Sequence, residues 1–275
     1  MYPAPIQVFF LPARQGARLC LYHTPAHGLT ESDCIVHIHA FAEEMNRCRR
    51  MAALTARSLA TQGYSVLQID LFGCGDSAGE FADARWEIWL DDIQVAVDWL
   101  KQRHRGAIHL WGDRLGALLA MSFAASHTEH KFDRMLLCQP VLDGKSYLAR
   151  LKRMQLARQM LNKQDLSATT LSNPLTGTEF SGYEIAQELI QSLEQQNALN
   201  WQLPVSRIHS LEIGSASTML PERQIFFSQW SQSGNPAQIL FVDGPAYWQT
   251  QEICQSQRWI DAVCRIFEKE NSDCN

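Results

Sequence analysis

GAIHLWGDRLGALLAMSFAASH, residues 106 to 127, contains a short apolar run, a turn between two glycines and a longer run that is apolar nearly all round. The first run, Ala107 to Trp111, has the length and composition of a buried strand. The second run is too long for a strand and predicts a helix that is buried on all sides. A strand that enters such a helix through a tight turn is typical of a parallel sheet covered by helices.

The same alternation continues along most of the chain. Apolar runs predict strands at 6–11, 18–23, 34–41, 65–71, 132–141, 204–213 and 237–244. Apolar stripes at helical spacing predict helices at 46–62, 85–103, 221–231 and 248–268. The first two strands form a hairpin that turns at Gln15-Gly16. The fold class is therefore α/β, a mostly parallel twisted sheet of about eight strands with helices on both faces.

The alternation stops between residues 142 and 203, where Lys, Arg, Gln and Asn are frequent. We expect a basic helix near 146–162, a polar loop near 167–178 and a helix near 183–196. This stretch is interpreted as a helical cap, 142–203, inserted into a core made of 1–141 and 204–275. The basic face of its first helix is interpreted as solvated, rather than as a membrane or acidic-partner surface, because no apolar excess lies beside it.

The composition excludes several classes of function. The chain has 275 residues, 46% of them hydrophobic, and a formal net charge of −5, which argues against a nucleic-acid partner. It shows no run of 18 apolar residues, so we expect no stable membrane insertion, and the N-terminus does not resemble a signal peptide. Eight scattered cysteines without a C-x-x-C pair indicate reduced thiols and a cytoplasmic protein.

Two motifs together resemble the α/β-hydrolase superfamily. Asp70-Leu-Phe-Gly73-Cys-Gly75-Asp-Ser77 is similar to a D-x-x-G-x-G-x-S turn that follows the fourth strand in many members. Gly112-Asp-Arg114-Leu-Gly116 stands where these proteins carry Gly-x-Ser-x-Gly, the strand–turn–helix that presents the nucleophile. The resemblance extends over nearly the whole chain and implies the α/β-hydrolase fold.

Three further phrases resemble one group within that superfamily, the exosortase A system-associated hydrolases of the second type. These phrases are Phe41-Ala-Glu-Glu-Met-Asn46, Leu110-Trp-Gly-x-Arg-Leu-Gly-Ala117 and Gln139-Pro-Val-Leu-Asp-Gly144. The resemblance implies a gene close to exopolysaccharide and PEP-CTERM sorting genes.

The usual catalytic triad is incomplete. Arginine replaces the serine at position 114, and a guanidinium that stays protonated is no nucleophile. The base of this fold follows the last strand, yet no histidine occurs after His209. The only candidate near the usual position of the acid is Glu212. Ser77 lies in a literal Gly-x-Ser-x-Gly, but no apolar helix follows it, so a turn-capping role is favoured.

Arg114 would lie at a helix N-terminus, where the helix dipole disfavours a cation by about 0.3–1 kcal/mol. We therefore expect an anion beside it, either Glu43 or Glu44 from the facing loop or a ligand carboxylate or phosphate. His37 and His39 share one face of a strand and are read as packing or pocket residues, so no metal and no cofactor is expected. The expected pocket residues are His39, Phe41, Gly112, Asp113, Leu115, Gly116, Gln139, Tyr247 and Trp248.

Two hypotheses about function remain open. The first is an atypical hydrolase of an acylated or anionic envelope metabolite, with Glu44 or Glu43 activating a water and Arg114 as the electrophile. The second is a non-catalytic binding module for an anionic or acyl small molecule or for a partner enzyme. Fold alone does not decide between them.

Overall fold

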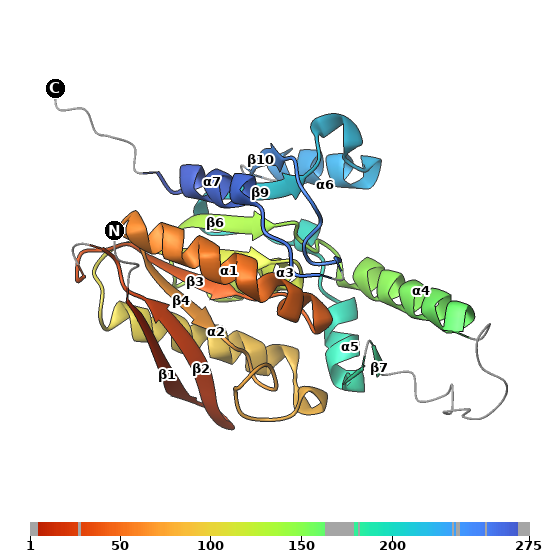
Figure 1. The fold of residues 1–275 in the computed structure, drawn as a ribbon, viewed down its shortest axis with the longest axis horizontal. Helices are drawn as coiled ribbons and strands as arrows, with labels where there is room; N and C mark the ends of the chain where they lie inside the picture. Colours follow the sequence, from red (N-terminus) through yellow and green to blue (C-terminus); the bar gives the residue numbers. More distant parts are fainter. Residues whose placement is uncertain are drawn as a thin grey trace.

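The fold is seen in a computed structural model, which describes residues 5–26, 29–162, 179–180, 182–232, 234, 237–250 and 252–268. An eight-stranded sheet runs through the molecule in the order β1-β2-β4-β3-β5-β6-β9-β10 (Figure 1). Its strands are β1 (Ile6–Ala13), β2 (Gly16–His23), β3 (Cys34–Ile38), β4 (Ser65–Ile69), β5 (Ile108–Asp113), β6 (Phe132–Cys138), β9 (Val205–Ile213) and β10 (Ala237–Val242). The β1–β2 hairpin is antiparallel, β2 pairs antiparallel with β4, and the other pairs are parallel. The predicted α/β class and strand count are confirmed.

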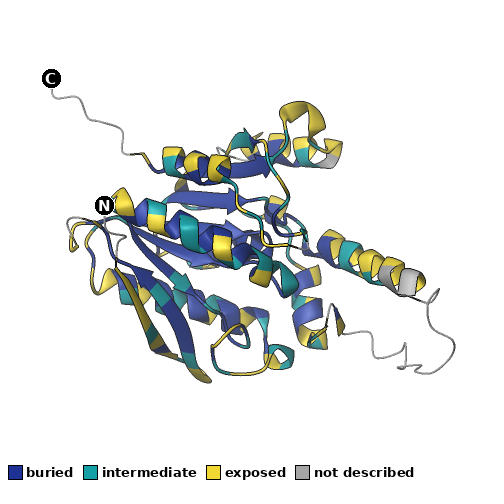
Figure 2. Ribbon diagram, in the orientation of Figure 1, coloured by how far each residue is buried: buried dark blue, intermediate teal, exposed yellow. Residues whose placement is uncertain are grey.

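Helices cover both faces of this sheet. The first layer contains α1 (Glu43–Thr61) and α7 (Gln257–Ile266), which contact each other. The opposite layer contains α2 (Trp86–Lys101), α3 (Leu115–Ser126) and α6 (Pro221–Gln232). Two hydrophobic cores lie between these layers and the sheet, so the central strands are buried throughout (Figure 2).

The helix after the elbow, α3, packs unusually close to the sheet. A methyl group on Gly116 would lie 2.3 Å from the carbonyl oxygens of Ile38 and His39, and one on Gly112 would lie 2.5 Å from the Cα of Ala117. Real side chains essentially never approach a neighbour that closely. The two glycines that flank the elbow are therefore required by packing, whatever residue stands between them.

Several element boundaries differ from the prediction. The strands expected to reach Phe41 and Val141 end at Ile38 and Cys138, and two helices begin at other residues than expected. The helix expected to begin near Asn46 begins at Glu43, because Glu43 and Glu44 form its first turn, where the helix dipole favours carboxylates. The last helix begins at Gln257 rather than at Trp248, with Ser256 as its N-cap. The loop before it buries Tyr247 and Trp248 in the core of the α1/α7 layer.

The segment between β6 and β9 carries α4 (Gly144–Asn162), α5 (Gln187–Glu194) and a short hairpin of β7 (Glu179–Phe180) and β8 (Tyr183–Glu184). The predicted helix near 146–162 corresponds to α4, which projects away from the sheet in Figure 1. The helix predicted at 183–196 is shorter, because the hairpin occupies its start. The polar loop predicted at 167–178 lies outside the described residues.

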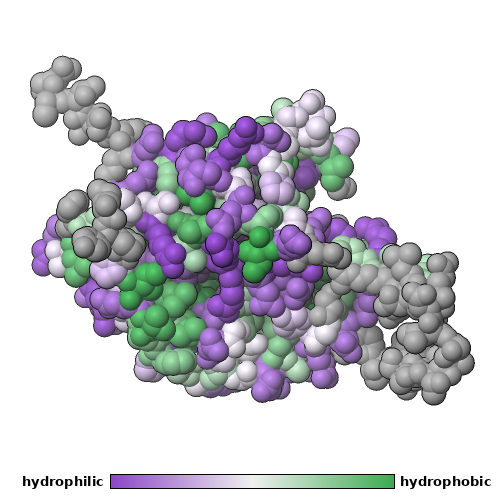
Figure 3. Space-filling view, in the orientation of Figure 1, coloured by the Kyte–Doolittle hydropathy of each residue, from purple (hydrophilic) through white to green (hydrophobic). Residues whose placement is uncertain are grey.

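The edge strand β1 has one exposed apolar face. Ile6, Val8 and Phe10 alternate along the strand and are 37%, 63% and 58% exposed. Figure 3 shows an apolar area of the surface over β1 and β2, at its lower left. Within the described residues, no helix has the length and apolar character needed to cross a membrane.

Candidate functional site

The residue at the nucleophile position has the strained backbone that the elbow requires. Arg114 lies between β5 and α3 with φ 55° and ψ −114°, a conformation that a non-glycine residue rarely adopts. Its N–H donates to the carbonyl of Cys138, and its own carbonyl accepts from Val141. Ala42 and Gln139, on the two loops beside it, also have positive φ angles. Such strain is concentrated at functional sites.

The side chain of Arg114 is buried and fully engaged. Its Nη2 and Nε donate to the two carboxylate oxygens of Glu44 at 3.2 and 3.3 Å, and Nη1 donates to the carbonyl of Gln139 at 2.7 Å. The guanidinium carbon lies 4.9 Å from the centre of the Trp248 ring, a cation–π distance. Only 5% of the residue is exposed. Of the two predicted partners, Glu44 therefore makes the pair.

Glu43 faces elsewhere. Its carboxylate accepts from Arg47 one turn further along α1 at 3.2 Å and from Asn46 at 3.3 Å, and its side chain is 41% exposed. Two residues that sequence analysis missed lie beside Glu44. The hydroxyl of Tyr147 donates to Glu44 at 3.3 Å, and a guanidinium nitrogen of Arg150 lies 3.8 Å from it. Both come from α4, and no sequence signal relates that helix to the elbow.

The ionisation of these groups follows from burial and from the ion pair. Burial acts to lower the pKa of Arg114, but the attraction and hydrogen bond of Glu44, together with the influence of Tyr147 and Cys48, exceed that effect, so the pKa of Arg114 is raised. Burial, together with the negative charge of Glu44, raises the pKa of Tyr147 well above its usual value. Burial and repulsion by Arg114 lower the pKa of Arg150. The site therefore holds two guanidiniums, one carboxylate and a neutral phenol.

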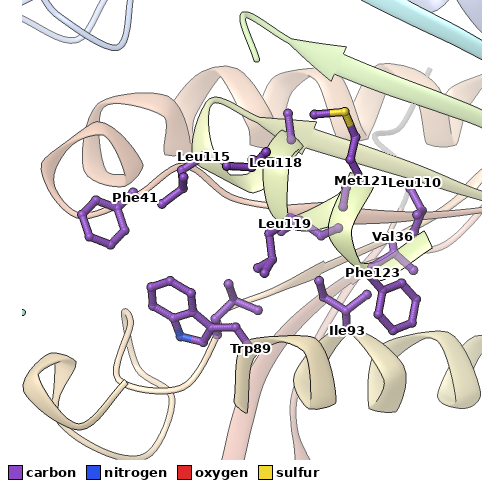
Figure 4. Close-up of a cluster of buried hydrophobic side chains, with 14 of the residues drawn as sticks. Val36, Phe41, Trp89, Ile93, Leu110, Leu115, Leu118, Leu119, Met121 and Phe123 are labelled. Atoms are coloured by element: carbon purple, nitrogen blue, oxygen red, sulfur yellow. The ribbon is translucent and has the colours of Figure 1, made fainter. Parts of the chain in front are cut away.

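A small apolar cavity lies beside the elbow. It has a volume of about 10 Å³, room for one water, and Phe41, Leu115, Gly116 and His39 form its wall toward the elbow. Trp86 and Trp89 of α2 and Leu119 of α3 also line it. In Figure 4, Phe41, Leu115, Leu119 and Trp89 converge from the β3 loop, α3 and α2. The amides of Leu115 and Gly116 belong to the first turn of α3, where a helix offers no internal acceptor.

The predicted pocket histidine has a structural role. His39 Nδ1 donates to the carbonyl of Ala40 at 2.7 Å, and its Nε2 accepts from the N–H of Leu71 at 3.2 Å. Burial lowers the pKa of His39, so the ring is neutral. Because its only lone pair is used, His39 cannot accept a further proton without breaking a backbone contact.

Asp113 lies on the other face of the sheet from the cavity. Its carboxylate accepts from His37 Nε2 at 3.0 Å and from the indole of Trp111 at 2.9 Å, and 2% of the residue is exposed. Gln68 donates to His37 Nδ1 at 3.3 Å, which leaves the proton of His37 on Nε2. Tyr247 is buried in the same region, and its pKa is raised well above the usual value, first by burial and then by Asp113. Neither Asp113 nor Gly112 lines the cavity.

The usual positions of the acid and the base are occupied by groups with other roles. Glu212, at the end of β9, accepts from Ser210 at 2.9 Å and forms a short ion pair with Arg223 of α6. The loop after β10 presents Tyr247 and Trp248 instead of an imidazole. Glu212 has no histidine to orient, and its charge is balanced by Arg223.

Ser77, the other candidate serine, stabilises the turn after β4. Its hydroxyl donates to the carbonyl of Asp70 at 2.5 Å and accepts from the N–H of Leu19 at 2.9 Å. Within the part of the chain that the structure describes, no three His, Cys, Asp or Glu side chains gather as a metal site requires.

The family model described as serine aminopeptidase, S33 (Hydrolase_4) matches residues 31–211. No curated protein matches the sequence. The fold is similar to that of Est1E from Butyrivibrio proteoclasticus, with a TM-score of 0.65 and 14% identity over 94% of this chain and 96% of that one. Two more similar structures are the Pyrococcus furiosus esterase Pf2001 (TM-score 0.62, 14% identity, 95% and 90% covered) and mouse alpha/beta hydrolase domain-containing protein 10 (TM-score 0.56, 16% identity, 94% and 96% covered).

These structures share the fold, at identities too low to transfer an activity. The family model covers most of the sheet, the elbow and the segment that contains α4 and α5. The chain belongs to the Hydrolase_4 (serine aminopeptidase, S33) family of α/β-hydrolases, with an arginine at the nucleophile position.

Proposed function

We propose that this chain is a non-hydrolytic member of its family that binds a small molecule with an anionic head and an acyl chain. The observation that carries the proposal is the Arg114–Glu44 ion pair at the nucleophile position. A residue that cannot attack a carbonyl has replaced the serine, and a carboxylate on the facing helix complements it. The elbow thereby becomes a site for an anion.

The charge balance of the site supports this proposal. Glu44 supplies one negative charge against the guanidiniums of Arg114 and Arg150, so the site has an excess positive charge. A ligand carboxylate or phosphate would take one of the places around Arg114 that Glu44 holds, in a bidentate contact of the kind arginine favours. The indole N–H of Trp248, beside Arg114, is buried without an acceptor among the described residues, and a ligand oxygen would supply one.

The apolar cavity is where the proposal places the chain of the ligand. Trp86, Trp89 and Leu119 offer an apolar wall a short distance from the elbow amides. The cavity has room for little more than a methyl-sized group, so a longer chain requires the aromatic side chains around Phe41 to move. We assign residues 142–203 to a cap over this site, because Tyr147 and Arg150 both reach Glu44.

The second candidate, an atypical hydrolase, is favoured by one observation. The elbow keeps its strained backbone, and the amide of Leu115 follows the nucleophile position, as one N–H of the oxyanion hole does in this fold. In that case Glu44 would activate a water and Arg114 would polarise the substrate. Against it, both oxygens of Glu44 already accept hydrogen bonds from Arg114, so the carboxylate acts as a counter-ion.

The three phrases that resemble exosortase-associated hydrolases suggest a setting for the ligand. In that setting the protein is cytoplasmic and its ligand is an acylated or anionic intermediate of exopolysaccharide or envelope metabolism. Sequencing of the genes that flank this one tests the proposed setting. A locus without exosortase or exopolysaccharide genes argues against that setting.

Octanoate and p-nitrophenyl esters of two to twelve carbons distinguish the two candidates. We expect octanoate to raise the melting temperature of the wild type but not that of Arg114→Met. Arg47→Met is the control: it removes the neighbouring ion pair with Glu43, and octanoate should still raise its melting temperature. We expect no ester turnover above the buffer rate. Turnover that Glu44→Gln abolishes and Ser77→Ala retains would overturn the binding proposal in favour of hydrolysis.

A further inference from the structure

The eight-stranded sheet ends on one side at β1, which has a neighbouring strand on one edge only. β1 pairs with β2, and no other strand of the described residues pairs with it. The open edge of such a strand presents a row of backbone N–H and C=O groups with which a further strand can pair. Which of these groups point outward decides what the edge can bind.

The ladder between β1 and β2 identifies the outward groups. The N–H of Thr24 donates to the carbonyl of Pro5 at 3.1 Å, so these two residues form a hydrogen-bonded pair of the antiparallel ladder. Such pairs alternate with pairs whose backbone groups point away from each other. Because the register continues unchanged along β1, the N–H and C=O groups of Ile6, Val8 and Phe10 point to the open edge.

The hydrogen bonds of β2 agree with this alternation. Leu19 lies opposite Phe10, yet its N–H donates to the hydroxyl of Ser77 at 2.9 Å and its carbonyl accepts from the N–H of Asp70 at 2.9 Å. Leu19 therefore bonds on the side away from β1. Phe10, as the other member of the same pair, directs its backbone groups away from β2.

The side chains of the same three residues form an open apolar face. Ile6, Val8 and Phe10 are between 37% and 63% exposed. The residues between them point to the other face of the sheet, where Phe9 stacks on Trp99 of α2 at 4.8 Å. The chain therefore covers one face of β1 itself and leaves the other to solvent, within the apolar area over β1 and β2 in Figure 3.

The open edge has little of the protection that natural sheets use. Charged side chains, proline or a bulge usually prevent pairing at such an edge. No residue from Ile6 to Ala13 is charged, and the register with β2 contains no bulge. Pro12, which has no N–H to donate, interrupts the edge only near the end of the strand. The segment from Ile6 to Phe10 is therefore open to pairing.

This segment is its own complement in an antiparallel arrangement. With a two-fold axis through Val8, Ile6 lies opposite Phe10 of a second copy, and the two Val8 residues lie opposite each other. Each outward N–H then meets an outward C=O, and each exposed apolar side chain meets another one. The neutral segment opposes no like charges. A second copy thus matches the edge in hydrogen bonds, hydrophobicity and charge.

We propose that two copies of this chain pair through β1, antiparallel and with Val8 on the two-fold axis, so that the sheet continues from one copy into the other. Standard interfaces bury about 1,600 Å² in total, more than one strand edge and three side chains per copy provide. The dimer is therefore weak and reversible. Because β2, β4 and β3 separate β1 from β5, dimerisation is independent of a ligand at Arg114.

Sedimentation velocity of the full chain over a range of concentrations tests the dimer. We expect a monomer–dimer equilibrium that Val8→Lys weakens by at least about tenfold, because two lysines would oppose each other at the axis. Gln7→Lys is the matched control, because Gln7 is exposed on the same strand but its side chain lies on the other face, opposite Phe9 of the second copy. Both substitutions are at exposed positions, so both variants should fold, which circular dichroism verifies.

A disulfide tests the register. The Cα atoms of an antiparallel hydrogen-bonded pair are about 5.5 Å apart, a separation that a disulfide spans. Val8→Cys should therefore cross-link two copies under mild oxidation. Gln7→Cys, which does not lie opposite itself, should give no more cross-linking than the wild type with its own cysteines.

Three results would overturn the proposal. The first is a wild type that stays monomeric at every concentration, which would leave the edge to a strand of another protein or to none. The second is a dimer that Val8→Lys leaves unchanged, which would place the interface elsewhere. The third is cross-linking of Gln7→Cys as extensive as that of Val8→Cys, which would show a different register. None of these results bears on the octanoate response, which tests the site at Arg114.

Discussion

The guanidinium of Arg114 and the carboxylate of Glu44 join the nucleophile elbow to the first turn of α1 through a two-pronged ion pair of 3.2 and 3.3 Å. Each partner also sits at a helix N-terminus, Arg114 before α3 and Glu44 within α1. The dipole of α1 favours Glu44, whereas the dipole of α3 disfavours Arg114. The attraction of Glu44 on α1 therefore offsets the unfavourable interaction of Arg114 with the dipole of α3.

Replacement of Arg114 by methionine should lower the free energy of unfolding by about 2–4 kcal/mol, because it leaves Glu44 partly buried with only Arg150 and Tyr147 beside it. Glu44→Gln in the same chain should recover part of that loss. Urea denaturation of the four proteins of the double-mutant cycle measures the coupling, which we expect to exceed about 1 kcal/mol. The exposed pair Arg258–Asp243 is the control, with a coupling below about 0.5 kcal/mol. Additive effects at positions 44 and 114 would contradict this prediction.

Restoring the serine should not restore a serine hydrolase. In Arg114→Ser the hydroxyl would occupy the elbow, but no histidine follows β10, and Glu212 remains paired with Arg223. An unactivated serine is a weak nucleophile. Neither the wild type nor Arg114→Ser should react with a fluorophosphonate probe under conditions that label an authentic serine hydrolase completely. Labelling at position 114 would show that another group acts as the base.

Ser77→Ala should reduce stability without changing any activity. The substitution removes the hydrogen bonds to Asp70 and Leu19 and leaves a buried N–H on β2 unpaired, so we expect a loss of about 1–3 kcal/mol in urea denaturation. Ser228→Ala, at an exposed position of α6, should change stability by less than about 0.5 kcal/mol. A stable Ser77→Ala variant would mean that the turn does not need this hydroxyl.

Stability should fall as the pH falls below 6.5, in part because of His109. Burial lowers the pKa of His109 to about 4, while nearby Asp33 and Asp133 oppose that shift. In the unfolded chain His109 has a pKa of about 6.5. Between pH 6.5 and 4 it is therefore protonated in the unfolded chain but mostly neutral in the folded one. The free energy of unfolding therefore decreases as the pH falls through this window, by up to roughly 3 kcal/mol from this residue. Below pH 4 its contribution becomes constant.

Urea denaturation of the wild type and of His109→Gln at pH 7, 6, 5 and 4 measures this effect. The variant should be less stable at pH 7, because His109 Nδ1 accepts from the N–H of Arg134, but its stability should vary less with pH. Equal slopes in the two proteins would show that His109 titrates normally in the fold.

Much of the fold followed from local patterns. Apolar runs located all eight strands of the main sheet, and the central strands are the most continuously apolar because they are buried on both faces. The starts of α1 and α7 were misplaced because the residues there do not follow the apolar spacing of a helix. Glu43 and Glu44 are polar residues in the first turn of α1, and Tyr247 and Trp248 are buried in a loop before α7. The β7–β8 hairpin was missed because two-residue strands have no period to detect.

The sequence alone determined that an arginine stands at the elbow, that the triad histidine is absent and that an anion must lie near position 114. These conclusions depend only on residue identity and on motif order, which no folding event changes. Only the tertiary structure decided that Glu44 and not Glu43 is the partner, because adjacent residues of a helix point about 100° apart and the packing angle of α1 selects one of them. It also brought Tyr147 and Arg150 to Glu44, contacts between distant segments that sequence periodicity does not encode.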